Sequence, residues 1–289
     1  MIRSFLFVPG DSERKQIKAL EGDADALILD LEDSVAPADK ARAREVVAAA
    51  IRAKRERGPA CWVRVNPLGS AFLQEDLATV VSARPDGIVL PKCGHACDVE
   101  RLSALIRPLE AVSNFPDGSI PILPIVTETA AGVLAAATYR DRSKRLFGLT
   151  WGAEDLATDL GAGRKRYDDG RYRDAFRLAR SVTLLGAVAA NVEPIDTVFP
   201  DFRNDEAFAE ECREAAIDGF TGKMAIHPAQ VSIINEAFTP SEEEVAEARM
   251  IVEAFGAAGD PGVLAVDGRM LDRPHLLQAR RVIARTSSG

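Results

Sequence analysis

The sequence is poor in the residues that mark several common classes of protein. Its 289 residues include four cysteines, too few for a disulfide scaffold in a chain of this size, so we expect reduced thiols. Only three histidines are present and no GxSxG motif occurs, so a nucleophilic triad is not supported. Lysine and arginine number 36 against 44 acidic residues, and the net charge of −8 argues against non-specific binding of nucleic acid.

Long hydrophobic runs are also missing. The longest nearly apolar stretch, residues 182–192, is too short to span a bilayer. The apolar residues 5–8 stop at Pro9-Gly10 and form no signal-peptide core. We therefore expect no membrane partner and a cytoplasmic location.

One short cluster combines thiols with an imidazole. Cys93, His95 and Cys97 lie within five residues, but their spacing is wrong for a zinc site and no second pair of ligands follows. We interpret this segment as the start of a helix that follows a strand.

Short apolar runs alternate with longer amphipathic stretches over the first 225 residues. Continuous apolar strands separated by helices are typical of a parallel sheet that is buried on both faces. The eight strands are predicted at residues 4–8, 26–31, 61–65, 87–90, 120–126, 145–149, 194–198 and 219–225. Eight such units predict an α/β fold of the TIM (β/α)8 barrel type. A doubly wound open sheet is the alternative, but no clear GxGxxG motif follows any strand.

The chain continues well beyond the eighth strand. We predict a barrel catalytic domain at residues 1–238 and a C-terminal helical extension at residues 239–289. Within the extension, Ser241-Glu242-Glu243-Glu244 is a strong helix start, residues 264–266 are extended, and residues 270–284 are helical at their end. A barrel does not need this extension to close, so we expect a lid or an arm that reaches a neighbouring subunit.

Polar residues at strand ends are the first candidates for a site, because TIM-barrel active sites lie at the carboxyl ends of the strands. These candidates are Asp30, Glu32, Asp33, Arg64, Asn66, Lys92, Glu128, Glu154, Asp155 and Lys223. Clustered carboxylates favour a hard divalent cation, most commonly Mg²⁺. Glu128 and Asp155 form the best ligand pair because they end adjacent strands. Alternatively, each carboxylate caps a helix or pairs with an arginine.

Two further features suit an anionic substrate. Gly152-Ala153 precedes a predicted helix, and its free backbone N–H groups could hold a carboxylate or a phosphate. Arg64 keeps its charge and offers a planar set of donors that suits a carbonyl or enolate oxygen. The alternatives are a plain capped turn at Gly152 and a structural salt bridge from Arg64 to Glu32 or Asp33.

Several motifs together resemble the HpcH/HpaI aldolase–citrate lyase β-subunit (CitE-like) family, on its CoA-ester lyase branch. The resemblance runs through the whole chain in order. It is carried by residues 3–10, 29–37 with Lys40, 63–66, 90–92, Glu128, 152–156, 223–230 and 268–275. These motifs are specific for the family and much less so for its substrate.

The resemblance implies a Mg²⁺-dependent lyase, with Mn²⁺ as an alternative ion, that cleaves a 3-hydroxyacyl-CoA thioester into a 2-oxo acid and an acyl-CoA. Citryl-, citramalyl- and malyl-CoA are typical substrates. Glu128 and Asp155 match the metal ligands, and Arg64 matches an arginine that contacts the oxo oxygen. The N–H groups of the turn match a carboxylate-binding segment; its residues are Gly152, Ala153, Glu154 and Asp155.

The same resemblance assigns residues outside this group and partners outside the chain. Arg3 and Lys18 match basic positions near the CoA phosphates. Asp272 matches an acid–base aspartate that often reaches a neighbouring subunit. A homotrimer or hexamer is implied, as are an acyl-carrier protein and other subunits if the chain works in a citrate lyase complex. A malyl-CoA thioesterase and a non-catalytic ligand-binding barrel remain the alternatives.

Overall fold

The structure, a computed structural model, describes residues 1–54, 57–140, 143–266 and 268–286. The chain forms two compact units, Ile2–Ile234 and Asn235–Gly289, and Met1 groups with the second. The predicted domain boundary between residues 238 and 239 lies just beyond this division. No helix among the described residues is both long and apolar enough to cross a membrane.

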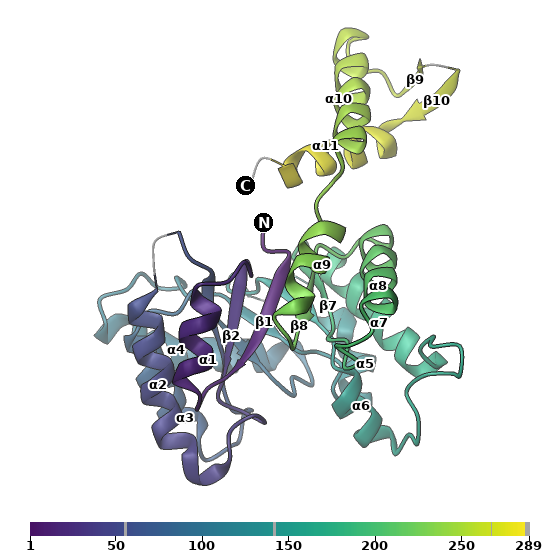
Figure 1. Ribbon diagram of the computed structural model, residues 1–289. Coiled ribbons are helices and arrows are strands. Elements are labelled where there is room, and N and C mark those ends of the chain that lie inside the picture. Colours follow the sequence, from purple (N-terminus) through teal and green to yellow (C-terminus); the bar gives the residue numbers. More distant parts are fainter. Residues whose placement is uncertain (55–56, 141–142, 267, 287–289) are drawn as a thin grey trace. The chain divides into compact units, whose positions relative to one another are not determined.

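Eight parallel strands of the first unit, as far as it is described, form one sheet (Figure 1). They are β1 (Ser4–Pro9), β2 (Ala26–Asp30), β3 (Ala60–Arg64), β4 (Gly87–Leu90), β5 (Ile122–Pro124), β6 (Gly148–Thr150), β7 (Glu193–Asp196) and β8 (Gly222–Ala225). Their order is β5-β4-β3-β2-β1-β8-β7-β6. Parallel bridges from Ile122 to Leu146 and from Ile125 to Thr150 join β5 to β6 and complete the circle. The TIM barrel is therefore confirmed, and the open-sheet alternative is wrong.

Helices follow the strands and cover the outside of the barrel (Figure 1). They are α1 (Glu13–Leu20), α2 (Lys40–Ala53), α3 (Leu73–Ser82), α4 (Ala96–Val112), α5 (Ala130–Ala135), α6 (Ala153–Leu160), α7 (Asp174–Ala190), α8 (Asp205–Asp218) and α9 (Ala229–Ala237). Two short 3₁₀ segments, Pro37–Asp39 and Ala136–Tyr139, precede α2 and follow α5. The imidazole of His95 caps α4 by accepting a hydrogen bond from the amide of Cys97, which confirms the helix-start interpretation.

Alternating strand residues fill the barrel interior. Phe5, Ile28, Trp62, Ile125 and Met224 belong to this buried cluster, while their strand neighbours pack under the helices. The indole of Trp62 needs the space left by Gly87 on the neighbouring strand, where a Cβ would lie 2.2 Å from the ring. The barrel core therefore depends on a tryptophan that packs over a glycine on the neighbouring strand.

A network of buried charges lies between the barrel and its helices. The ammonium of Lys223, which is 0% exposed, lies 2.6 Å from Asp196 Oδ2 and 3.0 Å from Glu211 Oε1. The indole N–H of Trp151 donates to Asp196 Oδ1 at 2.7 Å. Burying these charges is tolerable only because each has partners. The network links β7, β8 and α8 to the residue that precedes Gly152.

The second unit has its own small core. It contains α10 (Glu242–Ala257), an antiparallel hairpin of β9 (Val263–Val266) and β10 (Arg269–Asp272), and α11 (Arg273–Thr286). Ser241 and Glu244 form the capping box that starts α10. The core residues are Ala248, Ile251, Phe255, Leu271, Leu276 and Ala279. The helix predicted at the end of residues 270–284 is confirmed as α11, and the residues up to Asp272 pair with β9.

Candidate active site

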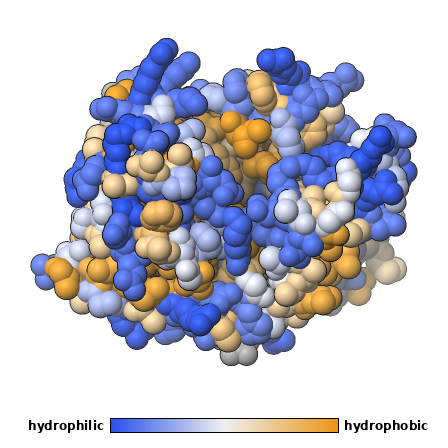
Figure 2. Space-filling model, turned by 90° about the horizontal axis from the view of Figure 1, so that it is seen from below, coloured by the Kyte–Doolittle hydropathy of each residue, from blue (hydrophilic) through white to orange (hydrophobic). Residues whose placement is uncertain are grey.

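A cavity of about 420 Å³ opens at the carboxyl ends of the barrel strands. Figure 2 shows this face, on which hydrophilic residues surround a recess with hydrophobic residues inside. The charged residues that line the cavity are Asp30, Asp33, Arg64, Glu128, Glu154 and Asp155. Apolar side chains that include Phe7, Ile125, Trp151, Val198 and Met224 form the remaining wall. The structure thus brings together the predicted strand-end residues of β2, β3, β5 and β6.

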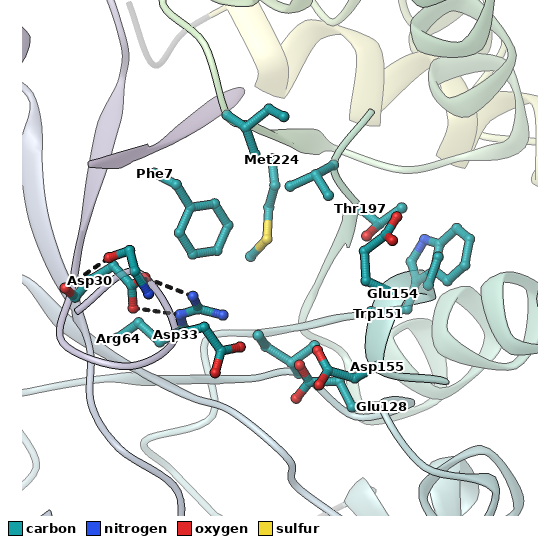
Figure 3. Close-up of a pocket in the computed structure, with 16 residues that line it drawn as sticks. Phe7, Asp30, Asp33, Arg64, Glu128, Trp151, Glu154, Asp155, Thr197 and Met224 are labelled. Atoms are coloured by element: carbon teal, nitrogen blue, oxygen red, sulfur yellow. Dashed lines mark hydrogen bonds and ion pairs between the residues drawn. The ribbon is translucent and has the colours of Figure 1, made fainter. Parts of the chain in front are cut away.

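Arg64 ends β3 and is held in a fixed orientation. Its Nε and Nη2 atoms donate to the two carboxylate oxygens of Asp30 at 2.7 Å each (Figure 3). Nη1 lies 3.0 Å from Glu32 Oε2, and the guanidinium lies 4.9 Å from the centroid of the Phe7 ring. Arg64 therefore forms the salt bridge to Glu32 that was given above as the alternative to a role in substrate binding. It also lines the cavity. Guanidinium has five N–H donors, so this pairing leaves donors for a ligand.

Asp30 stays ionised in this pair. Burial opposes the charged form, but the hydrogen bonds and charge of Arg64 outweigh that cost and lower the pKa of Asp30. The amides of Glu32 and Ser34 donate to Asp30 as well. Asp30 therefore orients both Arg64 and the segment that follows β2.

A buried lysine fixes the segment that follows β2. Lys40 Nζ donates to the carbonyl oxygens of Leu31 at 2.6 Å and Glu32 at 2.7 Å. Asn66 donates from Nδ2 to the same Leu31 carbonyl at 3.0 Å. Carbonyls at the end of a buried strand need such donors, because an unpaired buried acceptor is costly. Lys40 and Asn66 therefore support the site from outside the cavity.

Glu128 is the most perturbed acid of the cavity. Its side chain is only 3% exposed, and burial raises its pKa to about 8. The backbone N–H of Lys92 donates to Glu128 Oε2 and opposes the shift, while the charges of Asp155 and Glu32 add to it. A buried acid in a cleft with a neutral-range pKa is a typical feature of functional sites.

The turn before α6 makes room for Glu128. A Cβ at Gly152 would lie 2.7 Å from Glu128 Cγ, so only glycine allows this approach. Gly152 is the N-cap of α6, and no side chain caps the helix. The first N–H groups of α6 therefore remain suited to an anion. Glu154 forms an ion pair with Lys165, and Asp155 lies beside Glu128 (Figure 3).

The ammonium of Lys92 lies among these carboxylates, although no role was predicted for it from the sequence. Its ammonium lies 2.5 Å from Glu32 Oε1 and 3.7 Å from the nearest oxygens of Asp33 and Asp155. Its position at the end of the fourth strand was visible in the sequence. The contacts with three carboxylates depend on the assembled barrel.

The donor set fits a hard divalent cation. Glu128 and Asp155 supply carboxylate oxygens, and burial, which raises the pKa of Glu128, disfavours a charge that a cation would stabilise. Among the described residues, no group of three histidine, cysteine or acidic side chains is arranged to hold a metal. A cation here would therefore depend on these two side chains together with ligand and water oxygens, as Mg²⁺ sites often do.

Three predicted residues lie outside the cavity lining. Arg3 precedes β1, at the end opposite the cavity, and pairs with Asp25 at 2.8 Å. Lys18 lies exposed in the last turn of α1. Asp272 ends β10 in the second unit, where its Oδ1 lies 2.5 Å from His275 Nδ1. The roles predicted for these residues stay predictions.

Lys223, another strand-end candidate, points away from the cavity. It pairs with Asp196 outside the barrel, whereas the next residue, Met224, lines the cavity. Side chains alternate along a strand, so one residue decides which side of the barrel a charge occupies.

The fold and site define a class: a TIM-barrel enzyme whose cavity combines an oriented arginine with buried carboxylates at the strand ends. Comparison with known families identifies the class more closely. The model of the HpcH/HpaI aldolase/citrate lyase family matches residues 3–228. The chain therefore belongs to this family of lyase enzymes.

Individual relatives agree with this assignment. Citrate lyase subunit beta of Leuconostoc mesenteroides subsp. cremoris is 34% identical over 97% of this chain and 92% of the relative. A (3S)-malyl-CoA thioesterase of Cereibacter sphaeroides is also 34% identical, over 99% and 95%. The solved structure of protein CitE from Mycobacterium tuberculosis, in complex with magnesium, acetoacetate and coenzyme A, has a TM-score of 0.78 at 34% identity. It covers 99% of this chain and 98% of its own.

Proposed function

We propose that this protein is a Mg²⁺-dependent lyase that cleaves a 3-hydroxyacyl-CoA thioester of the citryl-, citramalyl- or malyl-CoA type into a 2-oxo acid and an acyl-CoA. One observation carries the proposal: buried Glu128 lies beside Asp155 at the uncapped N-terminus of α6, in the cavity that Arg64 also lines. Magnesium, acetoacetate and coenzyme A in the CitE structure support it.

Each group has a separate task in this proposal. Glu128 and Asp155 hold the cation, which when bound acts as a Lewis acid on the substrate oxygen. The N–H groups of residues 152–155 bind the substrate carboxylate, as helix N-termini do. Arg64, oriented by Asp30, donates to the oxygen on which charge develops.

The bond changes balance without a redox partner. The hydroxyl gives up its proton to a base, and its O–H electrons form the carbonyl of the 2-oxo acid. The adjacent carbon–carbon bond breaks, and its electrons pass into the thioester enolate, which then takes up a proton on carbon. Asp272 is the proposed acid–base residue, by its match to the family position, and Arg3 and Lys18 are the proposed contacts of the CoA phosphates.

The test is release of a 2-oxo acid, trapped as a hydrazone, from each of the three thioesters. We expect release from one thioester with Mg²⁺ or Mn²⁺ and none with EDTA. Glu128→Gln should reduce release by at least about 100-fold. Losing a residue that only hydrogen-bonds to a metal ligand already lowers metal affinity or activity by up to that factor, and Glu128 is a proposed ligand itself. Glu100→Gln, an exposed change on α4, should leave it unaltered. Metal-independent release, or full release by Glu128→Gln, would overturn the proposal.

A thioesterase is a second candidate because the chain is as similar to (3S)-malyl-CoA thioesterase as to citrate lyase subunit beta. Hydrolysis of malyl-CoA would release malate and free CoA without a 2-oxo acid. Measuring free thiol and hydrazone in the same reaction separates the two outcomes. A barrel that only binds its ligand would yield neither product.

The thioester carrier and the assembly are part of the proposal. A citrate lyase role would use an acyl-carrier protein and other subunits, whereas a free-standing enzyme would use CoA and, by its family, form a trimer or a hexamer. Co-purification with an acyl-carrier protein would support the first arrangement. Mass measurement of the purified protein in solution would give the number of subunits.

A further inference from the structure

Lys92 has contacts that the proposed reaction does not use. Its single ammonium contacts Glu32 and Asp33, from the segment after β2, and Asp155, from α6. These two segments follow β2 and β6, which lie across the barrel from each other in the strand order, so the ammonium links opposite sides of its carboxyl end.

The backbone of Lys92 is also unusual. Its φ of 53° lies in the left-handed region, which residues with a Cβ rarely adopt. Such a conformation persists only where the surrounding contacts enforce it. In this conformation the Lys92 amide donates to Glu128. One residue therefore contacts both proposed metal ligands, Glu128 through its backbone and Asp155 through its side chain.

The charges around Lys92 do not balance. Five acidic side chains converge here, and three cations face them: Arg64, Lys92 and, from outside the cavity, Lys40. The carboxylates are Asp30, Glu32, Asp33, Glu128 and Asp155. Arg64 pairs with Asp30 and Glu32, and among the described residues Lys92 is the cation that contacts Asp155. A divalent cation at Glu128 and Asp155 would neutralise the excess, but it would also lie close to the Lys92 ammonium and be repelled by it.

We propose that the Lys92 ammonium is the internal counter-cation of this carboxylate cluster. It holds Asp33, Glu32 and Asp155 together before a divalent cation binds, and its charge lowers the affinity for that cation. Lys92 is thus a positioning residue that sets the metal concentration at which the enzyme is loaded. The inference rests on the proposed metal site at Glu128 and Asp155.

The first test is binding of Mn²⁺, titrated by electron paramagnetic resonance without substrate. Lys92→Met removes the charge and keeps a long side chain, and it should bind Mn²⁺ about tenfold more tightly than the natural protein. Lys92→Gly should tighten binding similarly, since it keeps the amide donor and suits the positive φ. Lys54→Met is the matched control. Lys54 is similarly exposed and pairs with Asp86 at 2.6 Å ahead of β4, at the other end of the barrel, so its loss should not change Mn²⁺ affinity.

The second test is thermal unfolding with and without Mg²⁺. Lys92→Met should unfold at a lower temperature than the natural protein without metal, and Mg²⁺ should remove most of that difference. An equal loss with and without Mg²⁺ would mean an ordinary structural ion pair and would overturn the inference. Unchanged or weaker Mn²⁺ binding in both Lys92 variants would also overturn it. Failure of the natural protein to bind Mn²⁺ would instead overturn the metal site itself, so the two failures are distinguishable.

Discussion

Glu128 shows how burial changes the chemistry of one carboxyl group. In water a glutamate is ionised at neutral pH, but burial next to Asp155 and Glu32 raises the pKa of Glu128 to about 8. The metal-free protein therefore carries a proton on this group at neutral pH. A divalent cation must displace that proton, since only the carboxylate is a good ligand.

This competition predicts a pH-dependent metal affinity. Below about pH 8, the affinity of the natural protein for Mg²⁺ should rise about tenfold per pH unit, and it should level off above that value. Calorimetric titration in two buffers of different ionisation enthalpy would also detect the released proton. An affinity that is flat between pH 6 and about pH 8 would contradict a protonated Glu128.

The stability of the metal-free protein provides a control with a defined sign. The folded-state pKa of Glu128 lies above its ordinary value of 4.5. Its contribution to the free energy of unfolding is therefore complete below pH 4.5 and is lost as the pH rises to about 8. The glutamine in Glu128→Gln cannot ionise. The free energy of unfolding, measured with denaturant at a series of pH values, should therefore lack this pH-dependent loss in the variant. An identical slope in both proteins would argue against the shift.

At the scale of elements, the start of α6 determines the geometry of the site. Gly152 lies in the turn between β6 and α6. It leaves room for Glu128, and it has no side chain to cap the first N–H groups of the helix. Trp151, one residue earlier, is anchored to Asp196 on β7. The turn is thus held on one side by a buried hydrogen bond and shaped on the other by the absence of a side chain.

Gly152→Ala tests this arrangement directly. The added methyl group would displace the Glu128 side chain, so we expect turnover and Mg²⁺ affinity each to fall by at least about tenfold, because small displacements of reacting groups are costly. Gly163→Ala is the control, because a Cβ at that exposed position has nothing within 4 Å. Steady-state kinetics and Mg²⁺ titration provide the measurement. Natural activity in Gly152→Ala would show that Glu128 does not need its observed position.

At the scale of the whole molecule, the cavity and the acid–base candidate belong to different units. The barrel supplies Arg64, Glu128 and Asp155, and the second unit supplies Asp272 on a hairpin with its own small core. The role expected for the C-terminal unit, as a lid or an arm to a neighbouring subunit, stays a prediction. Asp272 is oriented within that unit by His275.

Asp272→Asn should separate chemistry from binding. Loss of a general acid–base group typically costs at least about 100-fold in rate, so turnover should fall that far while Mg²⁺ affinity stays unchanged. Asp260→Asn is the matched control, because Asp260 is in the same unit, pairs with Arg273 and adopts a positive φ that asparagine accepts. Undiminished turnover of Asp272→Asn would remove Asp272 from the mechanism.

Local sequence determined most of the elements. The helix predicted after Gly152-Ala153 matches α6, the helix start predicted at Ser241 matches α10, and the apolar runs match the eight strands within a few residues. Such features depend on periodicity and caps, which act over a few neighbouring residues. The strand-end rule also placed Arg64, Glu128 and Asp155 at one cavity, because parallel strands in a closed barrel end on the same side.

The tertiary structure decided what those residues meet. The pairing of Arg64 with Asp30, the shifted pKa of Glu128 and the three carboxylates around Lys92 all join segments distant in the sequence. The outward direction of Lys223 and the hairpin strand up to Asp272 depend on register and on partner strands, which no local pattern encodes. The sequence by itself therefore determined the barrel and the acidic residues at its mouth. Packing decided how those residues share charge, because burial and long-range contacts set the energy of each ionised group.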